Sequence, residues 1–246
     1  MHKKIRLNAA ATAGLLIILF FLIIAVFAPV IAPYDPKEMI ASYLPPSKEH
    51  ILGTNDVGQD IFSEMVYGTR VSLYIGIFAA FIVTGVGTVL ALVSGYFGGV
   101  ADKIITAITN IAMAVPSLPL TVLLIAYLNP GKWSLIIAIS ITAWTGTARI
   151  LRARVMQLKE LPFIKIEKTM GVHPAVILFK HILPNIKDII LTRGAMAISG
   201  AMMTEAGLSF LGLGEFGEKS WGSVLHYAFF RNSIMKKQYW WYVPPI

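Results

Sequence analysis

The chain has 246 residues, 56% of them hydrophobic and only 14% charged, and its mean hydropathy is +0.70. The apolar residues are gathered in long uncharged blocks, which is typical of an integral membrane protein and excludes a soluble globular domain. Cysteine is absent, which excludes disulfides and thiolate metal sites, and we expect the net charge of +8 on loops facing anionic lipid rather than on a nucleic-acid interface.

Five runs are predicted to cross the membrane as helices. About 20 helical residues cross roughly 30 Å of hydrocarbon, and lipid offers backbone polar groups no other partner. The expected spans are about 9–33, 71–96, 104–129, 133–150 and 189–211. The fourth is the shortest, with an uncharged core at Trp133–Ala148, and the fifth contains Arg193 and Glu205. The expected fold class is therefore all-α, with residues 1–246 forming one polytopic bundle.

Charges beside these spans predict the topology of the loops. The N-terminus is placed inside by three basic residues before the first span, Lys3, Lys4 and Arg6. The apolar run that follows, about 25 residues, is too long for the h-region of a signal peptide, so this helix is expected to remain uncleaved. The basic segment 151–187 is expected in the cytoplasm and the more acidic loop 34–70 outside. The segment 212–240 also falls outside, although it contains four basic residues, Lys219, Arg231, Lys236 and Lys237.

The cytoplasmic segment is predicted to contain two helices separated by a glycine turn. Residues 149–170 have helical composition and are expected to end at Gly171, since glycine most readily takes the left-handed conformation beyond a helix end. Proline is favoured at the first helical position, so Pro174 is expected to start a helix of about two turns over Ala175–His181. Leu183-Pro184 is expected to break that helix before the fifth span.

The second of these helices is expected to be exposed and to dock onto a partner. It carries apolar Val176, Ile177 and Phe179 beside basic Lys180, a composition that suits binding of a helix in a groove. The alternative is a solvated basic connector that only holds two long helices at the lipid surface.

Several residues inside the spans have two interpretations. Pro116 and Pro119 are expected to kink the third span, and the freed carbonyl groups either line a translocation path or serve bundle shape alone. Glu205, about six residues from the outer end of its span, either anchors that end or contacts the path. Arg193 is expected to extend to the inner surface.

Small and acidic residues elsewhere have simpler interpretations. Gly85 and Gly87 are expected to allow close packing of the second span. Asp56 and Asp60 in the outer loop are expected to cap turns, because the rest of a calcium-loop pattern is missing.

The glycine turn and the residues after it resemble the EAA loop of ATP-binding cassette importer permeases, above all those of the dipeptide, oligopeptide and nickel branch. In that branch a Gly is followed at a fixed spacing by His-Ile-Leu-Pro-Asn, which Gly171 and residues 181–185 match. Further matches run in order along the chain: Leu52-Gly53-Thr54-Asn55-Asp56 with Gly58-Gln59-Asp60, Tyr67-Gly68-Thr69-Arg70-Val71-Ser72-Leu73, Gly95-Tyr96-Phe97-Gly98-Gly99, Glu205-Ala206-Gly207-Leu208-Ser209-Phe210-Leu211-Gly212-Leu213-Gly214, Ser220-Trp221-Gly222 and Trp240-Trp241.

Three features depart from the family pattern. Lys165-Ile166-Glu167 stands where the family usually has Glu-Ala-Ala, which inverts a charge at a position that family members present to their ATPase. Gln59 stands where an arginine is common. The sequence ends at Pro244-Pro245-Ile246, where the family would begin a sixth span, so we expect a diverged or truncated permease.

The resemblance implies a permease subunit, not an enzyme, that forms half of the translocation path for peptides or for nickel or metal chelates. The implied ATPase-coupling residues are Lys165, Glu167, Gly171, His173, Pro174, Phe179, His181 and Pro184. No catalytic residue, metal site or cofactor is expected in this chain, and ATP and Mg would be bound by partner subunits. The implied partners are a second homologous permease, two cytoplasmic ATP-binding subunits, an extracytoplasmic solute-binding protein and the lipid of a prokaryotic inner or plasma membrane.

Three alternative functions are a homologue that does not transport, an intramembrane serine protease and a channel. A diverged homologue that no longer transports would keep the same fold. An intramembrane serine protease is suggested by Gly207-Leu208-Ser209, but it needs a histidine facing that serine, and all five histidines lie outside the expected spans. A self-sufficient channel would not need the docking loop.

Overall fold

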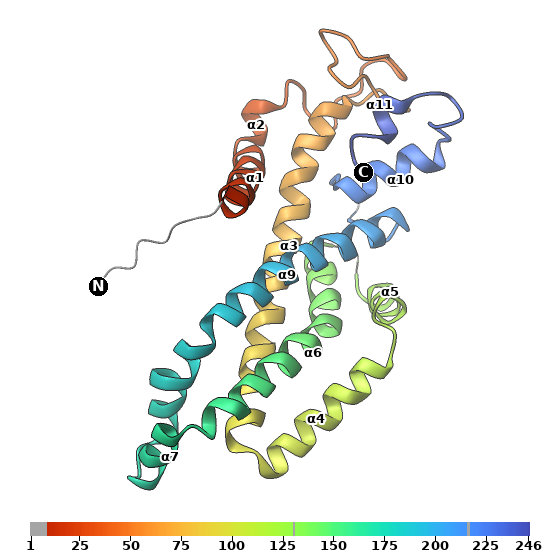
Figure 1. The fold of residues 1–246 in the computed structure, drawn as a ribbon. Coiled ribbons are helices and arrows are strands. Elements are labelled where there is room, and N and C mark those ends of the chain that lie inside the picture. The colour runs from red at the N-terminus through yellow and green to blue at the C-terminus, as the bar shows by residue number, and fades with distance from the viewer. Residues whose placement is uncertain (1–8, 130, 216) are drawn as a thin grey trace. The chain divides into compact units, whose positions relative to one another are not determined.

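The computed structural model describes residues 9–129, 131–215 and 217–246, and all regular elements in these ranges are helices (Figure 1). The α-helices are α1 (Ala9–Val26), α2 (Ala28–Ile31), α3 (Ile61–Leu92), α4 (Gly99–Ala114), α5 (Ser117–Tyr127), α6 (Lys132–Lys159), α7 (Pro162–Thr169), α8 (Pro174–Val176), α9 (Leu183–Phe210), α10 (Trp221–Phe230) and α11 (Tyr239–Tyr242). Two π-helical turns are also present: η1 (Val93–Phe97) directly follows α3, and η2 (Ile177–Ile182) directly precedes α9. The all-α prediction is confirmed.

The chain divides into two compact units. One contains residues 1–74 and 206–246, and the other contains residues 75–205. The first unit holds the long loop before α3 together with α10 and α11, and the second holds most of α3, most of α9 and the helices between them.

Two described helices are long and apolar enough to cross a membrane, Ile61–Phe97 and Lys132–Lys159. A third crossing is added if α4 and α5, which meet at 91°, count as one broken span. Helix α1 contributes a shorter apolar stretch, Thr12–Val26, and α9 is not among the helices that meet these criteria. The expected number of five spans therefore stays a prediction. The basic residues Lys3, Lys4 and Arg6 lie outside the described residues.

The bend between α4 and α5 confirms the kink expected in the third span. The chain leaves the helical conformation at Val115 and Pro116, whose ψ angles are 128° and 125°. A proline disfavours the helical conformation of the residue before it, so α4 ends at Ala114. The prediction was wrong for Pro119, which lies in the first turn of α5, where the missing N–H removes no helical hydrogen bond.

Close packing of helices in the second unit depends on particular glycines. A Cβ atom on Gly87 would lie 2.8 Å from the Cβ of Thr147, so the close approach of α3 and α6 expected at Gly87 is confirmed. A Cβ atom on Gly95 would lie 2.8 Å from Val155, which extends this approach into η1. The expectation was wrong for Gly85, because a Cβ atom there would meet nothing within 4 Å.

The first unit has a small apolar core around Trp241, which is only 1% exposed. This core gathers residues from α3, α10 and α11: Ile61, Val224, Ala228 and Trp241. The start of α3 is capped by Asp60, whose carboxylate accepts hydrogen bonds from the backbone N–H and the hydroxyl of Ser63, both at 2.8 Å. The expected capping role is confirmed for Asp60, which also contacts the ring of His50 at 3.0 Å.

Candidate functional site

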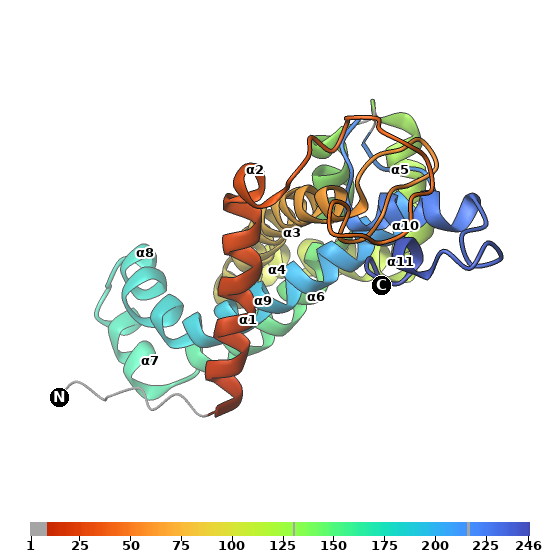
Figure 2. The ribbon, with the colours of Figure 1, turned by 90° about the horizontal axis from the view of Figure 1, so that it is seen from above.

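The segment between α6 and α9 forms a compact docking element, which we define as residues 160–182 (Figure 2). It comprises α7, α8 and η2 with the turns before α7 and between α7 and α8. The single helix expected over 149–170 is interrupted, because α6 ends at Lys159 and α7 starts at Pro162. Leu161 has φ −62° and ψ 142°, the extended conformation that a following proline favours. The helical composition of 149–170 favoured a single helix, although Pro162 could have predicted the break.

Helix α7 ends just before Gly171, as predicted. Gly171 has φ +78°, in the left-handed region where a side chain is strained. The N–H of Gly171 donates to the carbonyl of Lys168 and the N–H of Val172 donates to that of Glu167, which together form a Schellman motif. This turn satisfies the carbonyl groups at the helix end and reverses the chain.

The restart of the helix at Pro174 is also confirmed. The ring of His173 accepts a hydrogen bond at 3.3 Å from the N–H of Ala175, so His173 caps α8, and Pro174 occupies the first turn. The break expected at Pro184 was wrong, because the helical path continues through η2 into α9. A proline ring clashes with the carbonyl group four residues earlier, and the wider π-helical turn before Pro184 gives that group room.

Burial divides the docking element into an inner and an outer face. Ile177 was expected to be exposed, but it is fully buried, as are Ile182 and Ile164, in a core with Leu151 and Val155 of α6. The outer face keeps large exposed apolar side chains: Ile166 at 58%, Met170 at 76%, Val176 at 43% and Phe179 at 67%. The element is therefore fixed to α6 by its buried side chains, while several large apolar side chains stay exposed.

Charged residues of the docking element pair within it. Nε2 of His181 lies 2.9 Å from a carboxylate oxygen of Glu167, so these two predicted coupling residues meet. Lys165 instead pairs with Glu160 at 2.8 Å, and both side chains are more than half exposed. The hydrogen bond from Lys165, helped by its charge, holds the pKa of the Glu160 carboxyl below its usual value.

A cavity of about 540 Å³ lies in the second unit and is lined by α3, α4, α5, α6 and α9. Pro116 lines this cavity, whereas Pro119 and Glu205 are not among its lining residues. Glu205 is only 1% exposed. Arg193 also lines the cavity, and its expected extension to the inner surface stays a prediction.

Two arginines near the end of α6 connect it to α4. Arg152 on α6 donates two hydrogen bonds, at 2.6 and 2.7 Å, to the carboxylate of Asp102 on α4. Arg149, one turn earlier, donates to the side-chain oxygen of Asn110 at 2.9 Å. These two contacts were not predicted from the sequence. The three-residue spacing of the arginines could have indicated them, because it places both side chains on one face of a helix.

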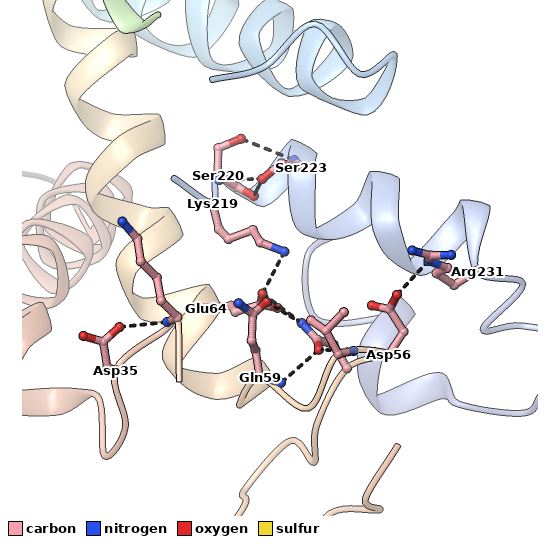
Figure 3. A network of polar contacts seen from close by, with 11 residues as sticks. Asp35, Asp56, Gln59, Glu64, Lys219, Ser220, Ser223 and Arg231 are labelled. Atoms are coloured by element: carbon pink, nitrogen blue, oxygen red, sulfur yellow. Dashed lines mark hydrogen bonds and ion pairs between the residues drawn. The ribbon is translucent and has the colours of Figure 1, made fainter. Parts of the chain in front are cut away.

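A second polar network lies in the first unit and connects residues of the segment 34–70 to the residues on either side of α10 (Figure 3). The buried carboxylate of Glu64 accepts hydrogen bonds at 3.0 Å from Asn55 and from Lys219. Arg231 pairs with Asp56 at 2.7 Å, so Asp56 forms an ion pair. Two of the four basic residues that disagreed with the predicted topology, Lys219 and Arg231, are thus neutralised by acids of the loop 34–70.

Gln59, which stands where the family often has arginine, belongs to the same network. Its side-chain oxygen accepts a hydrogen bond at 3.0 Å from Asn55, and its backbone N–H donates to the side chain of Asn55 at 2.9 Å. The position therefore keeps a buried polar role without a charge.

Comparison with known proteins identifies related sequences along most of the chain. Residues 87–235 match the family described as binding-protein-dependent transport system inner membrane component, and residues 1–46 match the N-terminal TM domain of oligopeptide transport permease C. The oligopeptide transport system permease protein OppC of Bacillus subtilis is 39% identical over 90% of this chain and 73% of its own length. The dipeptide transport system permease protein DppC of the same organism is 35% identical over 89% of this chain and 70% of its own length.

A third relative and a solved structure agree with these matches. The glutathione transport system permease protein GsiD of Pectobacterium atrosepticum is 36% identical over 92% of this chain and 76% of its own length. A structure of the MetNI methionine ABC transporter in an inward-facing conformation aligns with a TM-score of 0.59, covering 72% of this chain and 87% of the compared chain. At 18% identity this likeness shows the fold alone.

Proposed function

The chain belongs to the family of binding-protein-dependent transport system inner membrane components, and we propose that it is the membrane subunit of an ATP-driven importer of peptides. It is a transport permease and not an enzyme, so ATP hydrolysis belongs to partner subunits. The proposed assembly contains a second homologous permease, two cytoplasmic ATP-binding subunits that hold ATP and Mg, and an extracytoplasmic solute-binding protein. It is a protein of the bacterial inner membrane, and we propose that its N-terminus lies in the cytoplasm.

Peptides are proposed as the substrate because the relatives reported above are named for transport of oligopeptides, dipeptides and glutathione. Glutathione is itself a peptide, so the three names share one chemical class. Nickel or metal chelates stay a prediction from motif resemblance.

The docking element is the observation that carries this proposal. Its exposed apolar side chains, Ile166, Met170 and Phe179, are what a groove on a partner protein would cover. We propose that the groove belongs to an ATP-binding subunit and that the predicted coupling residues act there: Lys165, Glu167, Gly171, His173, Pro174, Phe179, His181 and Pro184.

The buried core that joins the docking element to α6 and α3 could transmit its movement to these helices. Ile177 and Ile182 of η2 pack in one buried core with Leu151 and Val155 of α6, and Ala91 of α3 belongs to the same core. A close-packed core moves as a unit rather than deforming continuously. Displacement of the docking element by ATP-driven closure would therefore move α6 and the end of α3, and we propose that this changes access to the path.

The translocation path is proposed to include the break at Pro116, where non-helical backbone lines the cavity. Irregular backbone at membrane depth is tolerated where it is buried in protein or lines a water-filled space. Pro119 and Glu205 stay candidates for the path. Pro119 would affect the shape of the helix beside it, and the carboxylate of Glu205 would contribute a charge to it.

Reconstitution tests the function directly. The chain, its second permease and both ATP-binding subunits are placed in proteoliposomes with the solute-binding protein, and uptake of a radiolabelled dipeptide is measured. We expect accumulation that requires ATP and every partner. Uptake without the ATP-binding subunits would identify a channel, and an intact complex with no uptake of peptides or nickel chelates would identify a homologue that does not transport.

A further inference from the structure

The cavity in the second unit contains one charged side chain among its described lining residues, that of Arg193 on α9. The Nε atom of this guanidinium is buried and has no hydrogen-bond partner in the described structure. The hydrogen bond that Arg193 does make, from Nη1, goes to the weak acceptor sulfur of Met196 at 3.9 Å. A cation thus lies beside the cavity with one buried N–H donor that no described residue accepts.

The cavity lining directly beside Arg193 leaves space for the guanidinium. Gly146 of α6 faces Arg193, and a Cβ atom there would lie 3.3 Å from Nη2. A Cβ atom at 146 would therefore require the guanidinium to shift by a few tenths of an ångström. The absence of a side chain at Gly146 therefore keeps the planar donor group at the cavity wall.

Hydroxyl groups complete the polar part of the lining. Thr121 of α5 and Thr142 of α6 are 3.1 Å apart through their hydroxyl oxygens. The hydroxyl of Thr147 is buried and has no partner among the described residues. The hydroxyls of Thr121 and Thr142 also donate to the backbone carbonyl groups of Ser117 and Ala138. The hydroxyl of Thr147 keeps its full hydrogen-bonding capacity, and the remaining lining is largely apolar.

We propose that this cavity binds the carboxylate of the transported peptide and that Arg193 is the residue that holds it. A buried guanidinium nitrogen without an acceptor is costly, and a carboxylate accepts two parallel N–H groups of an arginine. A cavity of about 540 Å³ is also of the size that small-molecule sites occupy. This inference rests on the proposed import of peptides.

Equilibrium binding tests it without the solute-binding protein, which has its own selectivity. The purified complex of both permeases and both ATP-binding subunits is placed in nanodiscs and titrated with radiolabelled dialanine and with dialanine amide. We expect the wild type to bind the acid about tenfold more tightly than the amide, because charge-assisted hydrogen bonds are lost with the amide. In Arg193→Gln the two affinities should become equal.

Two further variants separate this role from a general structural one. Arg193→Lys keeps the charge but loses the planar fork, so it should retain only part of the preference. Arg154→Gln removes an exposed arginine at the far end of α6 and should leave the preference unchanged. Dialanine uptake in proteoliposomes tests the proposed function separately, since its absence in the wild type would refute peptide import.

Other outcomes overturn the inference while peptide import stands. The inference fails if the wild type binds neither probe or binds both equally. It also fails if Arg193→Gln keeps the preference for the acid. Equal loss of acid and amide binding in Arg193→Gln would assign Arg193 to a contact with a neighbouring subunit or lipid, which also refutes it.

Discussion

Phe179 illustrates how exposure separates a partner contact from a folding contact at the scale of single residues. Its side chain is 67% exposed on the docking element, whereas Ile177, two residues earlier, is fully buried. Both are apolar and both were expected to face a partner. The difference arises because side chains two positions apart in a helical turn point to roughly opposite sides. The side that carries Ile177 packs in the core with α6.

Phe179→Ala is expected to weaken binding of the ATP-binding subunits about tenfold, since a central aromatic contact typically contributes more than about 1 kcal/mol. The unfolding temperature of the isolated permease should not change, because little buried area is lost. Binding is measured by biolayer interferometry on the reconstituted permease. Tyr127→Ala on α5, which removes a side chain that is 82% exposed, serves as the matched control and should bind normally.

Gly171→Val is expected to destabilise the turn after α7 by about 1–2 kcal/mol, because a β-branched residue is strained at φ +78°. The lower unfolding temperature and weaker ATPase association should appear together. Gly85→Ala is the control, since that glycine is helical and a Cβ atom there meets nothing within 4 Å. Normal stability and association in Gly171→Val would contradict the assignment of this turn.

At the scale of elements, the sequence predicted helix ends better where a glycine makes them than where a proline does. Gly171 ends α7 because its own backbone needs the left-handed region, a local property of one residue. The effect of a proline depends on the preceding turn. The helical conformation is broken before Pro116 and Pro162, whereas Pro119 and Pro184 lie within helical segments that continue. The π-turn that accommodates Pro184 has no signature in composition.

The candidate site was predictable to a similar extent. The glycine turn and the helix restart at Pro174 follow from local chemistry, and the motif order indicated the family. The cavity position of Arg193 did not follow, because the space beside it depends on Gly146 of another helix. The ion pair between Arg152 and Asp102 was missed for the same reason, since its partners are 50 residues apart.

The contact between α4 and α6 is tested by a double-mutant cycle. Asp102→Asn and Arg152→Gln should each lower the free energy of unfolding by about 1 kcal/mol, since the pair is bidentate but partly exposed. The double variant should lose less than the sum of the two. Strictly additive losses, measured by denaturant unfolding in detergent, would show that the two side chains do not interact.

At the scale of the whole molecule, function depends on which loops face the cytoplasm. The basic excess of 151–187 predicts that the docking element faces inward, and the ion pairs of Lys219 and Arg231 with acids of the outer loop reduce the conflicting charge outside. The docking element can meet ATP-binding subunits only if it lies on their side of the membrane.

The absence of cysteine in this chain allows a direct test of that orientation. Lys168→Cys on α7 and Lys48→Cys in the outer loop replace exposed residues, and intact cells are treated with a membrane-impermeant maleimide. We expect Lys48→Cys to be labelled at once and Lys168→Cys only after the membrane is permeabilised. Labelling of Lys168→Cys in intact cells would place the docking element outside, where no ATP-binding subunit could contact it, and would refute the proposed coupling.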